Sequence, residues 1–420
     1  MKKSYYKTIS FGFGHGEQLV KIASDNLLDV LTANKVDVPF DETLIIRQAL
    51  ENPIGAIPLH EIELDGKSIA IITSDITRPC PTAKLMPLLL DALYAGGAKK
   101  ENISLVFALG CHRHHSMEEQ KMLAGTRAWE EVRCVDSNPD DCVYMGRTKR
   151  GTPVNITRVV AEADIRICIG NIEYHYFAGY SGGAKAIMPG VSNREAIQSN
   201  HSIMVDENAC TGKLEGNPLR KDLEEAADIC GVDFILNVVL DEHKKILYAV
   251  AGHVKEAHRR GCQRLDSIYC KYISEKADII LVGQGGAPKD LNLYQTHKAL
   301  EIAKVAVKDG GIIILIGSCK EGFGESVFQQ WMEEANTPDE LIERIQSSFQ
   351  LGGHKAAAIA MVLQYADIFL VSEMADDVVE QCFMRPFHSV QDAFDAAIEK
   401  LGADATVLAM PYAGTTFPKL

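Results

Sequence analysis

Residues 165–201 read IRICIGNIEYHYFAGYSGGAKAIMPGVSNREAIQSNH. The apolar run Ile165–Ile169 predicts a buried strand, which the following loop leaves at its carboxyl end. That loop carries His175, a glycine run and Lys185, and His201 follows sixteen residues after the lysine. Ligands of open α/β sheets bind beyond the carboxyl ends of the strands. We therefore expect a ligand site here, with the lysine at the start of a helix.

Short apolar strands and helices alternate on both sides of this stretch, which is typical of mostly parallel sheets covered by helices on both faces. The sequence predicts an α/β fold. The predicted strands are 68–73, 103–109, 232–240, 278–282, 312–316, 367–371 and 406–410. The predicted helices are 83–95, 217–231, 254–269, a segment ending near 308, 325–334, 338–348, 354–365 and 390–401.

Three helix starts have the spacing of a capping box, in which a serine or threonine precedes a glutamate by three residues. These pairs are Ser116 with Glu119, Ser192 with Glu195, and Thr337 with Glu340. The second pair is expected to start the helix that carries His201.

The length of 420 residues predicts two domains. We expect a cofactor-binding domain over 1–270 and a C-terminal α/β domain over 271–403 that contributes substrate-binding residues. Pattern alone leaves open whether 404–420 pairs back onto the first domain. The active site is expected in the cleft between the domains.

Composition and charge exclude several classes of protein. The net charge of −14 argues against a nucleic-acid or anionic membrane surface. The 11 cysteines contain no CxxC pair and fall mostly in apolar runs, as in a reducing cytoplasm. No apolar run approaches the length of a transmembrane helix, and the N-terminus lacks the apolar region of a signal peptide.

Two loops after predicted strands carry polar side chains. Ser74–Thr82 (SDITRPCPT) contains Asp75 and Arg78, and the arginine could grip a phosphate or carboxylate. Gly110–Ser116 (GCHRHHS) holds three histidines suited to acid–base chemistry, without the HxxxH or HExxH spacing of a metal site. An Asx-turn and a solvated histidine loop are the alternatives for these two segments.

The segment GYSGGAK lacks the GxxxxGK[ST] spacing of a phosphate-binding P-loop, so that interpretation fails. Gln295 and Lys298, three residues apart, share a helix face and could hold a carboxylate. Taken singly, Gln295 and Lys298 are more typical of an exposed helix face, Lys185 of a helical lysine that faces solvent, and His201 of a polar residue with its hydrogen bonds satisfied. Together, the cations, imidazoles and glycine-flanked lysine indicate one site.

Four motifs make the chain resemble the nickel-pincer lactate racemase family along nearly its whole length. The matches are DITRP at Asp75–Pro79, GxHR at Gly110–Arg113, HYFAGYSGGAK followed by PG within His175–Gly190, and YQxxKA at Tyr294–Ala299. The long central motif is highly specific. The resemblance implies an isomerase that racemises or epimerises carbon 2 of a 2-hydroxy acid.

The resemblance also implies a cofactor, the nickel pincer nucleotide, a pyridinium mononucleotide whose two thiocarboxyl arms clamp nickel. Lys185 would hold it covalently through a thioamide, and His201 would be the protein ligand of nickel. His112 and His175 would be the acid–base pair while hydride passes to the pincer ring. The other implied contacts are Asp75, Ile76, Thr77 and Arg78 to the cofactor, and Arg78, Gln295 and Lys298 to the substrate.

One stretch departs from the family pattern. Where lactate-specific members place an aromatic residue, His354–Met361 reads HKAAAIAM. Small residues there would admit malate, phenyllactate or an aldonate as well as lactate. The implied partners are a small-molecule 2-hydroxy acid and the enzymes that make and insert the cofactor, and the oligomeric state stays open.

Two other functions remain for comparison. A non-catalytic carrier or sensor of the pincer or another nucleotide would need Lys185 and His201 but not the two histidine bases. A nucleotide-dependent kinase or dehydratase is disfavoured, because the sequence shows neither a P-loop nor a carboxylate cluster for magnesium.

Overall fold

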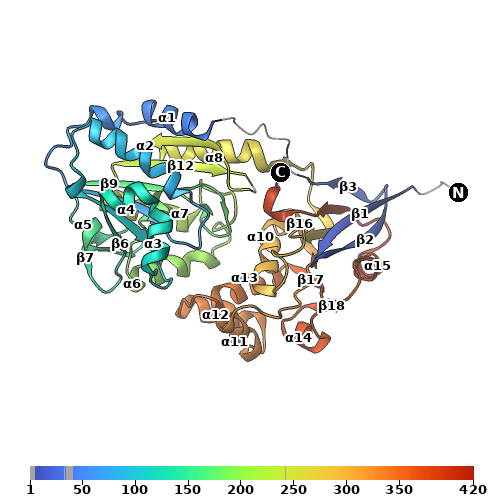
Figure 1. Cartoon of the computed structure of the whole chain (residues 1–420). Helices are drawn as coiled ribbons and strands as arrows, with labels where there is room; N and C mark the ends of the chain where they lie inside the picture. Colours follow the sequence, from blue (N-terminus) through green and yellow to red (C-terminus); the bar gives the residue numbers. More distant parts are fainter. Residues whose placement is uncertain (1–4, 33, 35–40, 242) are drawn as a thin grey trace. The chain divides into compact units, whose positions relative to one another are not determined.

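The computed structural model describes residues 5–32, 34, 41–241 and 243–420. The chain divides into two compact units (Figure 1). The middle unit is Val36–Ser267, and the terminal unit combines Met1–Lys35 with Ile268–Leu420. The two α/β domains with mostly parallel sheets that the sequence predicts are confirmed.

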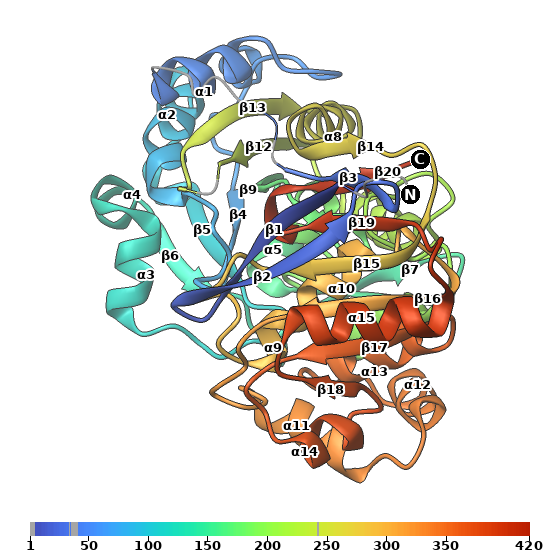
Figure 2. The ribbon, with the colours of Figure 1, turned by 90° about the vertical axis from the view of Figure 1, so that its right-hand side faces the viewer.

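The middle unit is built on a six-stranded sheet in the order β13-β12-β9-β4-β5-β6, which Figure 2 shows side by side. All neighbours are parallel except the antiparallel pair β12 and β13. The chain leaves β4 toward β5 and later returns to β9 on the other side of β4. The switch point of the topology, where ligands bind in such sheets, therefore lies between β4 and β9. The strand bounds are β4 Ile69–Ser74, β5 Ile103–Ala108, β6 Arg133–Asp136, β9 Ile165–Asn171, β12 Phe234–Leu240 and β13 Ile246–Gly252.

Helices cover this sheet because alternate strand residues are apolar on each face. One face, with Ile71, Phe107 and Leu236, forms a core with helices α1, α2 and α4. The helix bounds are α1 Glu42–Glu51, α2 Thr82–Ala95, α3 Met117–Ala124, α4 Thr126–Glu131, α5 Arg158–Ala161, α6 Arg194–His201, α7 Pro218–Cys230 and α8 Glu256–Tyr269. A two-stranded hairpin, β7 (Cys142–Arg147) and β8 (Pro153–Thr157), precedes α5.

The terminal unit holds a parallel six-stranded sheet in the order β18-β17-β16-β15-β19-β3. The antiparallel hairpin β1–β2 and helix α15 share a core with it. The strand bounds are β1 Tyr6–Phe13, β2 Gly16–Ala23, β3 Leu27–Val30, β14 Cys270–Tyr272, β15 Ala277–Gly283, β16 Val307–Ile316, β17 Ala366–Val371, β18 Arg385–Phe387, β19 Val407–Met410 and β20 Phe417–Lys419. The helix bounds are α9 Leu293–Thr296, α10 Leu300–Ala303, α11 Ser326–Glu334, α12 Pro338–Ser347, α13 Gly353–Leu363, α14 Asp376–Gln381 and α15 Val390–Leu401.

The expected division of the chain differs from this one at the N-terminal end, and the pairing of the C-terminal end had been left open. Residues 1–35, expected in the first domain, belong to the terminal unit, because β3 pairs with β19. Residues 404–420 belong to the terminal unit as well, where β19 lies between β15 and β3 and β20 pairs with β14. Strand pairing is decided by contacts distant in sequence, which a local pattern does not encode.

Several local predictions also need correction. The helix that carries His201 begins after Asn193, whose side chain accepts from Ala196 N, and not in a Ser192 box. Ser192 instead donates to the Ile187 carbonyl. The helix expected to reach residue 308 ends at Ala303, and β16 already begins at Val307. The Ser116–Glu119 capping box is confirmed.

None of the helices in the described part of the chain is long and apolar enough to cross a membrane. The 11 cysteines are not joined to one another by disulfide bonds.

Candidate functional site

The predicted loops of the middle unit follow β4, β5 and β9, the three adjacent strands around the switch point. The carboxyl ends of parallel strands meet at one edge of a sheet. The fold therefore brings the loops of Asp75, His112 and Lys185 to one edge of the sheet. The sequence had indicated one site for these residues but not which strands are neighbours.

Asp75 and His112 form a close pair across the first two loops. His112 Nδ1 donates to Asp75 Oδ2 at 2.6 Å, and the Thr77 hydroxyl donates to the same carboxylate at 2.9 Å. Burial acts to raise the pKa of Asp75, but the hydrogen bond and charge of His112, with the charge of Arg78, outweigh it and lower that pKa. In the neutral form of His112, donation by Nδ1 leaves the lone pair on Nε2, and this nitrogen can accept a substrate proton.

The neighbouring histidines have different surroundings. His115, almost fully buried, binds Asp136 through Nδ1 at 2.7 Å, and its Nε2 accepts from Ile76 N at 3.1 Å. His114 is exposed and lies 3.2 Å from the same carboxylate. His115 therefore holds the backbone of the loop that bears Asp75, a function for which the histidine run gave no separate signal.

The glycines of the central motif are required by close packing. Gly182 and Gly183 have φ of 76° and 56°, and Gly183 N donates to Asn237 Oδ1 at 2.8 Å. A Cβ at Gly183 would lie 2.8 Å from the His258 ring. The lysine follows in a short 3-10 helix, Gly183–Ala186, instead of the start of a regular helix. The two glycines thus fix the turn that presents Lys185.

A buried network of charged side chains stabilises the turn at Gly182 and Gly183. Arg220 donates to the Tyr180 carbonyl at 3.2 Å and to Glu224 at 2.6 Å, and His258 Nε2 donates to the Ser181 carbonyl at 2.8 Å. Burial acts to raise the pKa of Glu224, but Arg259 and Arg220 lower it to about 2. Sequence reasoning missed these residues, because nothing local links α7 and α8 to the glycine turn.

Lys185, His175 and His201 all lie around one aromatic ring, that of Phe177. Lys185 Nζ is 5.7 Å from its centroid, and the ring centroids of His175 and His201 are 4.5 and 4.9 Å from it. Burial, together with the charge of Lys185, lowers the pKa of His201 to about 3. His201 is therefore neutral at physiological pH, the state in which imidazole binds metals. Phe177 was not singled out from the sequence.

In the terminal unit, Lys298 Nζ donates to Gln295 Oε1 at 2.6 Å, so these two predicted residues are neighbours. In the middle unit, Thr77 and Arg78 are exposed in the loop between β4 and α2, and Ile76 is half-buried. Among the described residues, no group of three or more His, Cys, Asp or Glu side chains could hold a metal ion.

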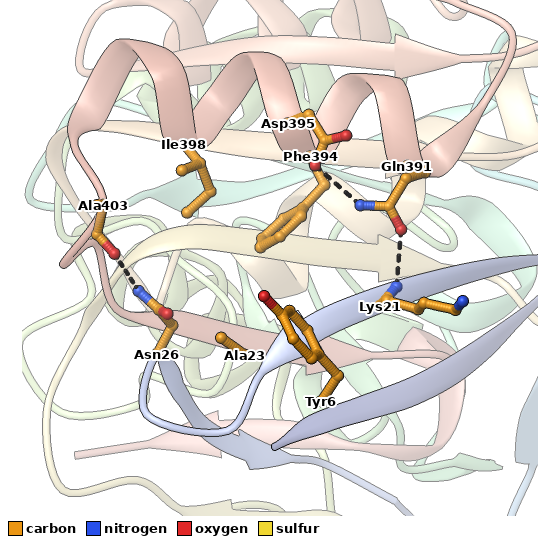
Figure 3. Close-up of a pocket in the computed structure, with 9 residues that line it drawn as sticks. All are labelled: Tyr6, Lys21, Ala23, Asn26, Gln391, Phe394, Asp395, Ile398 and Ala403. Atoms are coloured by element: carbon orange, nitrogen blue, oxygen red, sulfur yellow. Dashed lines mark hydrogen bonds between the residues drawn. The ribbon is translucent and has the colours of Figure 1, made fainter. Parts of the chain in front are cut away.

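A hollow of about 690 Å³ lies elsewhere in the terminal unit, between the β1–β2 hairpin and α15. Phe394 and Tyr6 point into it from opposite sides (Figure 3). At its edge, Lys21 N donates a hydrogen bond to Gln391 Oε1, and Asn26 Nδ2 donates one to the Ala403 carbonyl. None of the predicted site residues lines it.

Comparison with known sequences gives matches along the chain. A family model described as the lactate racemase N-terminal domain matches residues 13–212, and one described as the lactate racemase C-terminal domain matches residues 273–415. A lactate racemase of Thermoanaerobacterium thermosaccharolyticum is 33% identical over 415 residues, which cover 96% of this chain and 97% of the relative. A lactate racemase of Lactiplantibacillus plantarum is 32% identical over 380 residues, with 87% and 88% covered.

Comparison with solved structures agrees. The lactate racemase apoprotein from Thermoanaerobacterium thermosaccharolyticum superposes with a TM-score of 0.88 at 31% identity, covering 99% of this chain and all of that one. A crystal structure of a Thermotoga maritima protein gives a TM-score of 0.60 at 18% identity over 92% of this chain, a likeness of fold alone.

Proposed function

Because this chain belongs to the lactate racemase family, we propose that it racemises a 2-hydroxy acid with a nickel pincer nucleotide bound covalently to Lys185. The family and isomerase class predicted from the sequence are confirmed. The observation that carries the proposal is the placement of an amine and a neutral imidazole around Phe177, with His201 close enough to Lys185 for the lysine charge to lower its pKa.

The residues present fit this cofactor. Lys185 offers an amine for a thioamide, and His201 offers one neutral nitrogen to a nickel ion whose other ligands belong to the cofactor. One protein histidine would be enough for such a metal. Ile76, Thr77 and Arg78 of the loop after β4 would contact the nucleotide, as would Asp75. When bound, the cofactor would accept and return the hydride of the substrate carbon.

The protein's own part is proton transfer on two sides of the substrate. His112 Nε2, with Nδ1 bound to Asp75, would take or return the hydroxyl proton of one enantiomer. His175, whose Nδ1 accepts from Ala178 N at 3.3 Å, would serve the other enantiomer. Two bases are needed because the hydroxyl groups of the two enantiomers point in opposite directions.

Substrate binding is proposed for Arg78, Gln295 and Lys298, whose cations and amide suit a carboxylate. Lactate, malate, phenyllactate and an aldonate are the candidate substrates. The first turns of α13 carry Ala356, Ala357 and Ala358 in place of a bulky aromatic residue, which supports acids larger than lactate. We also place the protein in the cytoplasm, with the cofactor-making and cofactor-inserting enzymes as its partners.

The test is intact-mass and chiral analysis of protein co-expressed with the cofactor-making enzymes. We expect a covalent adduct that is lost in Lys185→Ala, and interconversion of enantiomers in a panel of lactate, malate, phenyllactate and gluconate. An adduct with no turnover across the panel would favour the carrier or sensor. Full activity of Lys185→Ala would refute the covalent cofactor. The Asp75–His112 pair favours the enzyme, since a carrier needs no polarised base.

A further inference from the structure

A buried set of hydrogen bonds converges on Asp222 of α7, a residue that no motif singled out. Its carboxylate accepts from the hydroxyl groups of Thr148 at 2.5 Å and Thr152 at 2.8 Å, which both lie in the turn between β7 and β8. It also accepts from Asn200 Nδ2 at 2.8 Å. Asp222 and Asn200 are only 1% and 0% exposed, so water does not supply alternative partners.

These contacts determine which way the Asn200 amide faces. A carboxylate only accepts hydrogen bonds, so the NH₂ group of Asn200 must face Asp222. The amide oxygen then faces the other way, and Asn200 Oδ1 lies 3.1 Å from His201 Nδ1. An amide oxygen also only accepts, so the imidazole must carry its proton on Nδ1. The lone pair of His201 consequently lies on Nε2.

We propose that Asn200 and Asp222 are positioning residues that fix His201 as the Nδ1–H tautomer, with Nε2 as the nitrogen presented to the metal. Partners in the outer shell commonly fix the tautomer of a ligating histidine in this way. The tautomer follows from the protein alone, whereas the metal part of the inference rests on the proposed function.

The neutral amide has a specific advantage over a carboxylate at this place. A carboxylate bound to Nδ1 would stabilise a protonated imidazole, which cannot ligate a metal. The Asp222 carboxylate orients the Asn200 amide, and the amide in turn orients the His201 ring. The negative charge of Asp222 therefore does not contact that ring. Asp222 thus orients His201 indirectly, through Asn200.

The tautomer is tested on cofactor-free protein labelled with ¹⁵N-histidine, by long-range ¹H–¹⁵N correlation. The His201 signals are assigned by their loss in His201→Gln. In the wild type we expect Nδ1 to be the protonated nitrogen and Nε2 to be the lone-pair nitrogen. In Asp222→Asn the amide at 222 can donate to Asn200 Oδ1, and only the longer 3.4 Å bond from Asn200 Nδ2 to the Leu219 carbonyl still favours the wild-type direction of the Asn200 amide. A substantial Nε2–H population should therefore appear.

Thr148→Val is the matched control, because it removes a hydrogen bond to Asp222 while leaving the carboxylate to orient Asn200. Its His201 tautomer should equal that of the wild type. Asn200→Ala gives a second route to the same answer if Asp222→Asn does not fold. The proposal would be overturned if His201 of the wild type were protonated on Nε2. It would also be overturned if Asp222→Asn and Asn200→Ala both folded and both kept the wild-type tautomer.

The metal part is tested on cofactor-loaded protein by following nickel loss to a chelator alongside the Lys185 adduct mass. Asp222→Asn should keep the adduct but release nickel about 10- to 100-fold more readily than Thr148→Val. Equal nickel retention in the two variants would refute the role in metal binding. A wild type without adduct or nickel would instead refute the proposed function, and the tautomer result would stand independently.

Discussion

Two regions of the middle unit carry histidines that are held in opposite ways. In the loops after β4 and β5, here called the acid–base loops, His112 is partly exposed and bound to the Asp75 carboxylate. From β9 to the end of α6, here called the anchor segment, His201 is buried and bound to the Asn200 amide. The same side chain thus has a charged partner in one region and a neutral one in the other.

Under the proposed function, this difference would let one residue type serve two kinds of chemistry. A carboxylate partner stabilises the imidazolium that forms when a histidine accepts a proton, so it suits a base. Burial with an amide partner keeps the ring neutral, so it suits a metal ligand. The anchor segment also contains glycines that pack directly against His258 and Asn237, where a Cβ would not fit.

The largest expected effect comes from making the acid–base loops resemble the anchor segment. Asp75→Asn replaces the carboxylate at His112 with an amide and should lower kcat of the loaded enzyme about 10²-fold, which equals about 2.7 kcal/mol. The Lys185 adduct, followed by intact mass, should remain. Asp91→Asn, an exposed carboxylate paired with Arg127, is the control and should match the wild type. Activity of Asp75→Asn within about threefold of the wild type would remove the contrast.

The next effect concerns the tight turn of the anchor segment. Gly183→Ala would place a residue with a side chain in the left-handed backbone region and would put its Cβ 2.8 Å from the His258 ring. The substitution should therefore lower the free energy of unfolding by about 3 kcal/mol. Gly151→Ala has a φ of 93° but open space around it, and should cost only about 1 kcal/mol. Urea unfolding followed by circular dichroism compares the two. Equal losses would mean that close packing does not constrain this turn.

A third prediction follows from the burial of His258. Burial, and next the charge of Arg220, holds the pKa of His258 well below 6.5 in the folded protein. Below about pH 6.5 the unfolded chain binds a proton there that the folded chain does not, so stability falls as pH falls. The contribution is about 1.4 kcal/mol between about pH 7.5 and about pH 5.5.

His258→Gln should therefore lose less stability than the wild type over the same pH interval, as measured by urea unfolding at both pH values. The control is His60→Gln, on the exposed side chain of His60, which should follow the wild type. A His258→Gln slope as steep as that of the wild type would contradict the assignment of a buried neutral imidazole.

The smallest effects separate two adjacent histidines of the acid–base loops. His115→Ala removes the buried acceptor of Ile76 N and should lower kcat/KM about tenfold. His114→Ala, exposed beside the same Asp136, should change kcat/KM by less than about twofold. Steady-state racemisation rates compare them. If both variants behaved alike, His115 would have no particular role in holding the loop.

The sequence by itself determined what is local. Alternating apolar segments predicted the α/β fold and most element positions, including a helix at 390–401 that the structure reproduces residue for residue. Motif and loop position singled out His112, Lys185 and His201 as candidate site residues, and the family resemblance supplied their predicted roles. Patterns of this kind depend on residues a few positions apart, so a single sequence contains them.

The tertiary structure alone decided which groups are partners. The contacts of Asp75 with His112, of Asn200 with Asp222 and of His258 with the Ser181 carbonyl join residues that lie 37, 22 and 77 positions apart. The placement of β3 beside β19 likewise joins the two ends of the chain. Such contacts arise because buried polar groups must find partners once the sheets and helices pack, and no local pattern contains that information. The sequence supplied the histidines, and the fold assigned one to a carboxylate and the other to an amide.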